Sequence, residues 1–193
     1  MVDIEKHPYN SFFPSGSKKL ILGSFPPHRF TQVDKKNSLD EKDIDFYYGS
    51  RFNYLWPLVS DNCAVDLSNP ELIMNFLISK KVGITDIIER CRRKLTITGT
   101  PSALDKDLEI IDFRNIEEIL NSDSLLQILC TSKYVHENFL KHYQCRKCVE
   151  VIVLPSPSRS ASRAIGRSVE YKELKSNSYN TINFRRAIYK KYL

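Results

Sequence analysis

The chain has 193 residues, of which 41% are hydrophobic and 27% charged, and it contains only 6 Gly and 9 Pro. This composition excludes a disordered, collagenous or coiled-coil protein and is typical of a globular domain, which we expect to span residues 1–193. The formal net charge of +6 is compatible with a polyanionic partner and carries no information about the fold.

The first half of the chain predicts one buried strand and two helices. Residues 1–17 are expected to form an extended lead-in whose aromatic rings pack onto the domain. The apolar run 20–23 stops at Gly23 shortly before two prolines, which predicts a buried strand followed by a loop. Residues 28–45 are polar and aperiodic, which predicts a long loop with at most a weak helix. The segment 52–59 is expected to be helical at its start, and helical spacing of apolar residues predicts a helix over 70–81 with Pro70 in its first turn.

The second half of the chain alternates between short strands and helices. The expected elements are a strand edge or helix entry over 82–88, a short helix over 115–121, a strand over 125–130, a helix over 133–143, a strand over 149–154 and an amphipathic helix over 179–192. Thr131 and Ser132 are candidate caps of the helix that follows them. Residues 102–111 give no clear pattern.

Strands separated by helices predict parallel pairing. We therefore expect an α/β protein, a three-layer α/β/α sandwich with a central, mostly parallel four-stranded sheet. In such folds the ligand binds outside the carboxyl ends of the strands. The loops after the first and last predicted strands, 23–27 and 154–158, are thus the expected rims of a site.

The basic surplus lies at one end of the chain. Residues 155–193 carry 9 of the 29 Lys and Arg but only 2 of the 23 Asp and Glu. A local positive field suits nucleic acid, because neutralising phosphates releases condensed counterions. The alternative is a solvated basic helix. Arg159, Arg163 and Arg167 follow one another at four-residue spacing, so they share one face if this stretch is helical.

Several classes of protein find no support in the sequence. No apolar run approaches the ~20 residues that span a bilayer, and residues 1–6 lack the order of a secretion signal, so we expect a cytoplasmic protein with no membrane partner. Only Cys145 and Cys148 form a C-x-x-C pair. Structural zinc sites usually combine two such pairs, so we expect no metal site. Gly-rich phosphate loops and nucleophile elbows are missing as well.

Three segments, 23–27, 46–57 and 154–163, combine backbone amides, hydroxyls, an asparagine, aromatic rings and arginines. Four stretches occur along the chain in the order LILGSFPP (20–27), FYYGSRFNYLWPLV (46–59), VGITDI (82–87) and VIVLPSPS (151–158). This ordered set resembles the uracil-DNA glycosylase superfamily, nearest to its hypoxanthine-DNA glycosylase branch. The resemblance implies a monomeric, monofunctional DNA glycosylase without a cofactor. Such an enzyme hydrolyses the N-glycosidic bond of a deaminated base, uracil or hypoxanthine, that is flipped out of DNA.

The resemblance also assigns roles to individual residues. Asn53 matches the catalytic asparagine of the branch and would position water or the base without titrating, so activity should vary little around neutral pH. Its alternative role is that of a helix cap or turn residue. Tyr48 would stack on the flipped base, and Trp56 would anchor the core. The first loop would line the base pocket with Gly23, Ser24, Phe25 and Pro26. The late loop and the arginines after it would bind DNA through Ser156, Pro157, Ser158, Arg159, Arg163 and Arg167.

Two departures from the superfamily keep other functions open. Phe25 stands where well-known branches carry Asp or Asn, and Leu154 stands where many members carry a base-contacting His. A relative that binds nucleic acid without removing a base is therefore the alternative, and a small-molecule α/β enzyme is a third option. His28 is a titratable group next to the first loop, and Asp86 is expected to tie the sheet edge.

Overall fold

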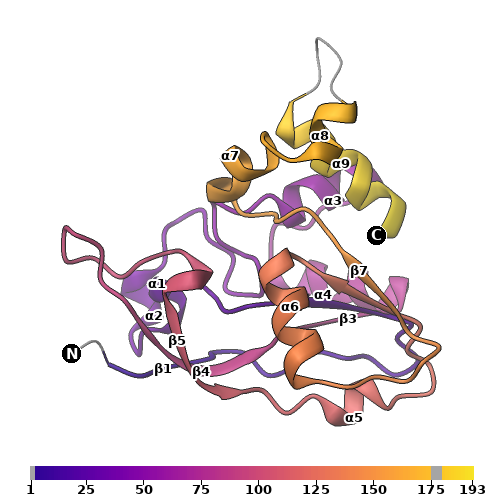
Figure 1. Cartoon of the computed structure of the whole chain (residues 1–193), viewed down its shortest axis with the longest axis horizontal. Helices are drawn as coiled ribbons and strands as arrows, with labels where there is room; N and C mark the ends of the chain where they lie inside the picture. Colours follow the sequence, from indigo (N-terminus) through magenta and orange to yellow (C-terminus); the bar gives the residue numbers. More distant parts are fainter. Residues whose placement is uncertain (1–2, 175–179) are drawn as a thin grey trace.

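The computed structural model describes residues 3–174 and 180–193 and has the predicted α/β architecture (Figure 1). Its main sheet is parallel, in the order β3-β2-β6-β7. The strands are β2 (Lys19–Gly23), β3 (Val82–Asp86), β6 (Gln127–Cys130) and β7 (Glu150–Val153). Gly23 pairs with Asp86, and Cys130 with Val153, so the carboxyl ends of all four strands meet at one edge. The predicted four-stranded parallel sheet is confirmed.

The strand β2 divides the core into two apolar layers. Successive side chains of a strand point to opposite faces. Leu20 and Leu22 accordingly enter one apolar cluster, and Ile21 enters the other. Helices α3 (Leu55–Cys63), α4 (Pro70–Lys80) and α9 (Thr181–Tyr192) cover the Ile21 face, and α5 (Glu117–Leu120) and α6 (Lys133–His142) cover the opposite face. Figure 1 shows α6 in front of the sheet and α4 behind it.

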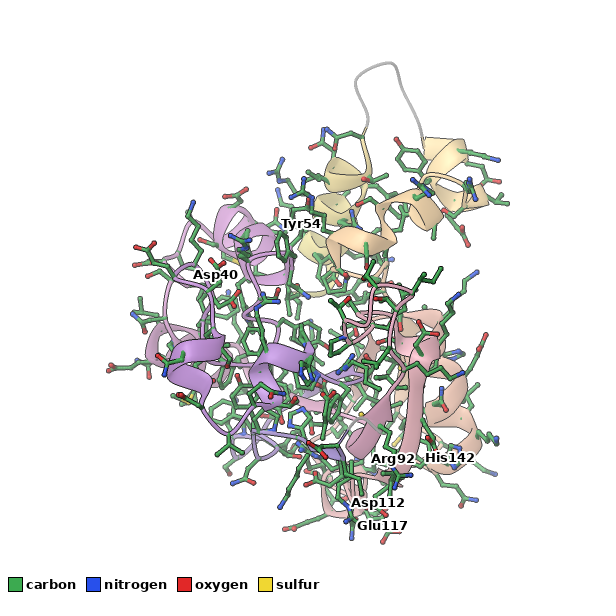
Figure 2. The ribbon with its side chains drawn as sticks, turned by 90° about the vertical axis from the view of Figure 1, so that its left-hand side faces the viewer. Asp40, Tyr54, Arg92, Asp112, Glu117 and His142 are labelled. Atoms are coloured by element: carbon green, nitrogen blue, oxygen red, sulfur yellow. The ribbon has the colours of Figure 1, made fainter. Side chains whose placement is uncertain are left out.

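A second, antiparallel sheet was not predicted. It consists of β1 (Glu5–Lys6), β4 (Ile88–Arg93) and β5 (Leu108–Phe113), in the order β1-β4-β5. The many charged residues of β4 and β5 give these segments no apolar pattern from which a strand could be predicted. In the structure, Arg90 pairs with Asp112, and Arg92 with Glu109, across the two strands. Figure 2 places Arg92 and Asp112 at the end of the molecule opposite Tyr54. The lead-in 1–17 contributes β1, and its first two residues lie outside the described part.

The remaining helices are short. They are α1 (His28–Thr31) and α2 (Lys35–Ser38) within the predicted loop, the 3-10 turns η1 (Asp105–Asp107) and η2 (Arg159–Ala161), and then α7 (Ser162–Ile165) and α8 (Val169–Leu174). The helix expected from Phe52 begins at Leu55, and the cap role of Ser132 is confirmed by its bond from the Val135 N–H. The helix expected over 179–192 is α9; position 179 lies outside the described residues. None of the described helices is long and apolar enough to cross a bilayer.

Helix α9 is joined to the loop after β7 by the side chain of Arg185. This guanidinium is fully buried, and it donates to the carbonyl oxygens of Ser156 at 2.7 Å and Ser158 at 2.9 Å. It also lies 5.3 Å from the ring centre of Tyr54, which Figure 2 shows where the start of α3 meets the C-terminal helices. Burial lowers the pKa of Arg185 below its ordinary value, but an arginine remains charged in proteins. A cation to which the sequence analysis gives no individual role thus holds this loop from the interior of the protein.

Replacing Arg185 should destabilise the protein more than the loss of one surface charge. In Arg185→Met, carbonyl oxygens of the loop lose their donors, and each buried unsatisfied group costs roughly 1–3 kcal/mol. We expect the free energy of unfolding, measured by urea denaturation, to fall by about 2–4 kcal/mol. Lys190→Met removes one positive charge from an exposed position of the same helix and should change stability by less than about 0.5 kcal/mol. Equal losses in the two variants would show that Arg185 does not hold the loop.

Candidate functional site

A cleft of about 1250 Å³ opens at the carboxyl ends of the parallel strands. Its walls include the loop after β2, the segment 46–53, the turn η1, the start of α6 and the loop after β7. Residues of α1, β3, β4, α7, α8 and α9 complete them. The two rims expected from the sequence therefore face one cavity. Of the predicted site residues, ten line it: Ser24, Phe25, Pro26, Tyr48, Asn53, Ser156, Pro157, Ser158, Arg159 and Arg167. Gly23 and Arg163 are not among the lining residues.

Gly23 lies beneath two oxygens of the cleft floor. A Cβ atom at this position would lie 2.1 Å from Asp86 Oδ1 and 2.1 Å from the hydroxyl of Tyr48. Both distances are far inside van der Waals contact, so only glycine fits. The contribution of Gly23 is therefore the space that brings the Asp86 carboxylate and the Tyr48 hydroxyl together above the strand end.

The rest of the first loop is held by Arg93 of β4. Its guanidinium is buried, donates to the carbonyl oxygen of Pro26 at 2.9 Å, and pairs with Glu5 at 3.1 Å. Burial tends to raise the pKa of Glu5, but its hydrogen bonds with Arg93, His28 and Thr31 and the charge of Arg93 lower it overall. His28 also belongs to this cluster, because its Nδ1 lies 2.8 Å from Glu5, and it does not line the cleft. Phe25 is buried, edge to face with the His7 ring.

Tyr48 has a backbone conformation that side chains rarely adopt. Its φ is +57°, in the left-handed region that costs a non-glycine residue of order 1–3 kcal/mol. The next residue must be glycine, because a Cβ atom at Gly49 would lie 1.8 Å from the carbonyl oxygen of Ile44. The Tyr48 hydroxyl shares a hydrogen bond of 3.0 Å with the hydroxyl of Thr131. Burial raises the pKa of Tyr48 well above its ordinary value, so this phenol stays neutral and can donate or accept.

Asn53 lies where the segment 52–54 pairs with the late loop. It forms an antiparallel bridge with Ser158, and the Tyr54 N–H donates to the carbonyl oxygen of Pro157 at 2.9 Å. Its side-chain Oδ1 accepts the N–H of Leu55 at 2.9 Å, which is the turn role considered as its alternative. Within residues 3–174 and 180–193, the Asn53 Nδ2 has no hydrogen-bond partner. This amide can therefore donate to a group bound in the cleft.

The arginines after the late loop are exposed, and they do not share one helical face. The stretch is broken into η2, α7 and a turn, so Arg159 and Arg167 line the cleft while Arg163 does not. In the described part of the chain, none of the three forms an ion pair. Leu154 is buried in the core and offers the cleft no polar atom. The cleft edge thus presents unpaired cations beside the hydroxyls of Ser156 and Ser158.

Two carboxylates of the cleft were not recognised as site residues from the sequence. Asp86 ends β3 as expected and is buried, with Oδ2 2.9 Å from His7 Nε2. Asp105, in η1, is half-buried, and its Oδ1 accepts the Ser24 hydroxyl at 2.8 Å. The carboxyl-end rule that selected Gly23 also applies to Asp86, its partner in the sheet. No comparable signal marks Asp105, because residues 102–111 have no pattern.

Asp105 has an unusual titration. Burial is the largest influence and raises the pKa of its carboxyl above the ordinary value, and the nearby Asp86 raises it further. The hydrogen bond from Ser24 and the charge of Arg93 oppose this rise without cancelling it. A carboxyl of this kind keeps its proton to a higher pH than an exposed aspartate does.

Within residues 3–174 and 180–193, no three His, Cys, Asp or Glu side chains are arranged to hold a metal ion. The cysteines of this part, Cys145 and Cys148 included, are free thiols.

Comparison with known proteins supports the fold. No protein-family profile and no curated protein sequence matches the chain. Among solved structures, the chain is similar to a solution NMR structure from Methanosarcina acetivorans that is described as a "putative Uracil DNA glycosylase". The two share 21% sequence identity with a TM-score of 0.59, and the alignment covers 98% of each chain. The chain therefore has the fold of that protein over nearly its whole length.

Removing the Asp105 charge should stabilise the protein in a pH-dependent manner. The folded-state pKa of this carboxyl is raised, so its stabilising contribution is present below the unfolded-state pKa of about 3.9 and is lost as pH rises through the folded-state value. Asp105→Asn avoids that loss. We expect the variant to have a higher free energy of unfolding than the parent at pH 7 and no advantage at pH 3.5, as measured by urea denaturation.

Glu109→Gln provides the control, since this side chain is exposed in the adjoining strand. It should leave the pH dependence of stability unchanged. An Asp105→Asn difference that is the same at both pH values would contradict the raised pKa.

Proposed function

We propose that this protein is a DNA glycosylase that hydrolyses the N-glycosidic bond of a deaminated base, uracil or hypoxanthine, flipped out of DNA. The observation that carries the proposal is the joining of the first loop, the Tyr48 to Asn53 segment and the Pro-Ser-Pro loop around one cleft, beside exposed cations. The likeness to a structure described as a "putative Uracil DNA glycosylase" adds support at the level of the fold.

The reaction requires few groups from the protein. As the C1′–N bond breaks, the sugar gains positive charge and the base leaves as an anion, which hydrogen-bond donors stabilise. The Asn53 Nδ2 and backbone N–H groups of the first loop are the donors that we assign to the base or to the attacking water. Tyr48 supplies the aromatic face of the pocket. An extruded base is read by such donors and by stacking.

DNA contact is assigned to the late loop and the arginines beside it. Ser156 and Ser158 have hydroxyls at the cleft, and hydroxyl and backbone donors are common partners of phosphates. Arg159 and Arg167 add positive charge at the same edge. Because phosphate contacts carry no sequence information, we expect this set to determine affinity and register rather than base choice.

Release of a damaged base is the direct test of this function. Oligonucleotides with a single uracil, hypoxanthine, xanthine or ethenocytosine, single- and double-stranded, should be cleaved by alkali after incubation with the protein in at least one case. Asn53→Ala should lower the single-turnover rate by roughly 10²–10³-fold, the cost of losing one well-placed donor. Asn121→Ala, an exposed position at the end of α5, should not change the rate.

Salt-dependent DNA binding without base release would instead favour the nucleic-acid-binding relative. The absence of both activities would favour a small-molecule enzyme.

The assigned DNA edge predicts a particular salt dependence. Replacing Arg159, Arg163 and Arg167 together by Gln should weaken DNA binding and reduce the slope of log K against log salt by up to about three times 0.9. Because Arg163 does not line the cleft, a loss of about two charges would still fit. Three exposed lysines away from the cleft serve as the matched control: Lys80, Lys141 and Lys147. Equal slopes in both triple variants would contradict the assignment.

A further inference from the structure

The first loop has no side chain of its own that can accept a proton from water. Phe25 occupies its central position, is buried, and packs against the ring of His7. The guanidinium carbon of Arg93 lies 5.8 Å from the centre of the Phe25 ring. Asn53 faces the cleft, but a neutral amide does not take up a proton near neutral pH. A hydrolysis in this cleft therefore lacks a general base among the residues recognised from the sequence.

A carboxylate reaches the same loop from another part of the chain. Asp105 projects from η1, and its Oδ1 accepts the Ser24 hydroxyl at 2.8 Å. Its second oxygen, Oδ2, has no hydrogen-bond partner among residues 3–174 and 180–193. Both Ser24 and Asp105 line the cleft. One oxygen thus orients the carboxylate on the first loop and leaves the other available to a bound water.

Asp86, the other carboxylate of the cleft, is less suited to this role. It is only 5% exposed, and its Oδ2 is held by His7 Nε2. Its Oδ1 lies over Gly23, close to the hydroxyl of Tyr48. Both oxygens therefore already face protein groups, and Asp86 acts on the cleft mainly through its charge.

We infer that Asp105 is the general base of the base-excision reaction, an inference that rests on the proposed function. Its Oδ2 takes one proton from the attacking water as the water oxygen bonds to C1′ of the sugar. The C1′–N bond breaks, its electron pair leaves with the base, and the base anion is held by the donors of Asn53 and the first loop. The proton on Asp105 then passes to the departing base or to solvent, which restores the carboxylate.

The groups around Asp105 fit this chemistry. Ser24 donates a hydrogen bond to Asp105. The charge of Asp86, in β3, raises the pKa of Asp105, and the charge of Arg93, in β4, lowers it. The phenols of Tyr48 and Tyr134 are titratable groups that interact electrostatically with Asp105. Burial, as the largest influence, raises the pKa of Asp105. A base is most effective when its pKa approaches the working pH. The carboxylate that the first loop lacks is thus supplied from η1.

The pH profile of base release tests the inference. Single-turnover rates are measured from pH 4 to pH 8 on an oligonucleotide from which the protein releases a base. These rates should fall at the acidic end of the range, where Asp105 is protonated. Asp105→Asn should lower the plateau rate by roughly 10²–10⁴-fold and abolish the acidic fall, with DNA affinity unchanged. Asp107→Asn, a change within the same turn at a residue that does not line the cleft, should keep both the rate and the fall.

Ser24→Ala provides an independent readout. Its hydroxyl lowers the pKa of Asp105, so removing it should move the acidic fall to higher pH. A change in packing alone would not cause that displacement. This variant tests the inference independently of the Asp105→Asn result.

The outcomes separate the two proposals. If the parent protein releases no base from any substrate, the proposed function fails, and Asp105 loses its role with it. If the parent releases a base with a flat pH profile, or if Asp105→Asn retains the parental rate, the function stands and the assignment of Asp105 is overturned. An acidic fall that Ser24→Ala leaves in place also overturns it.

Discussion

The late side of the cleft depends on one buried cation. Arg185 reaches from α9 to the carbonyl oxygens of Ser156 and Ser158, and it has no carboxylate partner in the described part of the chain. Prolines 155 and 157 have no N–H to offer, so the backbone pairing of this loop with the segment 52–54 leaves other carbonyl oxygens of the loop without a backbone donor. A guanidinium has five N–H donors in a fixed plane. It can therefore satisfy several carbonyl oxygens at once and hold them in a single arrangement.

The opposite rim uses the same solution. Arg93 donates to the carbonyl oxygen of Pro26, in a loop that also contains two prolines. The difference lies in the counter-charge, because Arg93 pairs with Glu5 whereas Arg185 relies on neutral oxygens and the ring of Tyr54. Arg93 lines the cleft and Arg185 does not, but each of them orients its rim through carbonyl oxygens of the loop backbone.

The residues that were predictable from the sequence are those whose role follows from local periodicity. Leu20, Ile21 and Leu22 form a continuous apolar run, and such a run between helices indicates a parallel strand buried on both faces. The carboxyl-end rule then selected two loops whose residues line the same cleft. Strands β4 and β5 were not predicted, because their charged residues give no apolar pattern and form ion pairs only across the folded sheet. The burial of Arg185 could not be predicted for a related reason. Arg185 stands between Phe184 and Arg186, and the amphipathic pattern of this helix does not distinguish a buried arginine from a solvated one. Asp105 acquires its importance only through the long-range contact with Ser24.

The contact between Arg185 and the late loop also bears on the order of folding. Ser156 and Arg185 are 29 residues apart in the chain, and α9 follows the last strand of the main sheet. Elements nearer the N-terminus are synthesised first and can begin to fold first. During synthesis the parallel sheet can assemble while the Pro-Ser-Pro loop still lacks its donor. The edge assigned to DNA is consequently the part of the cleft that is completed last, after α9 has been made and has packed against α3.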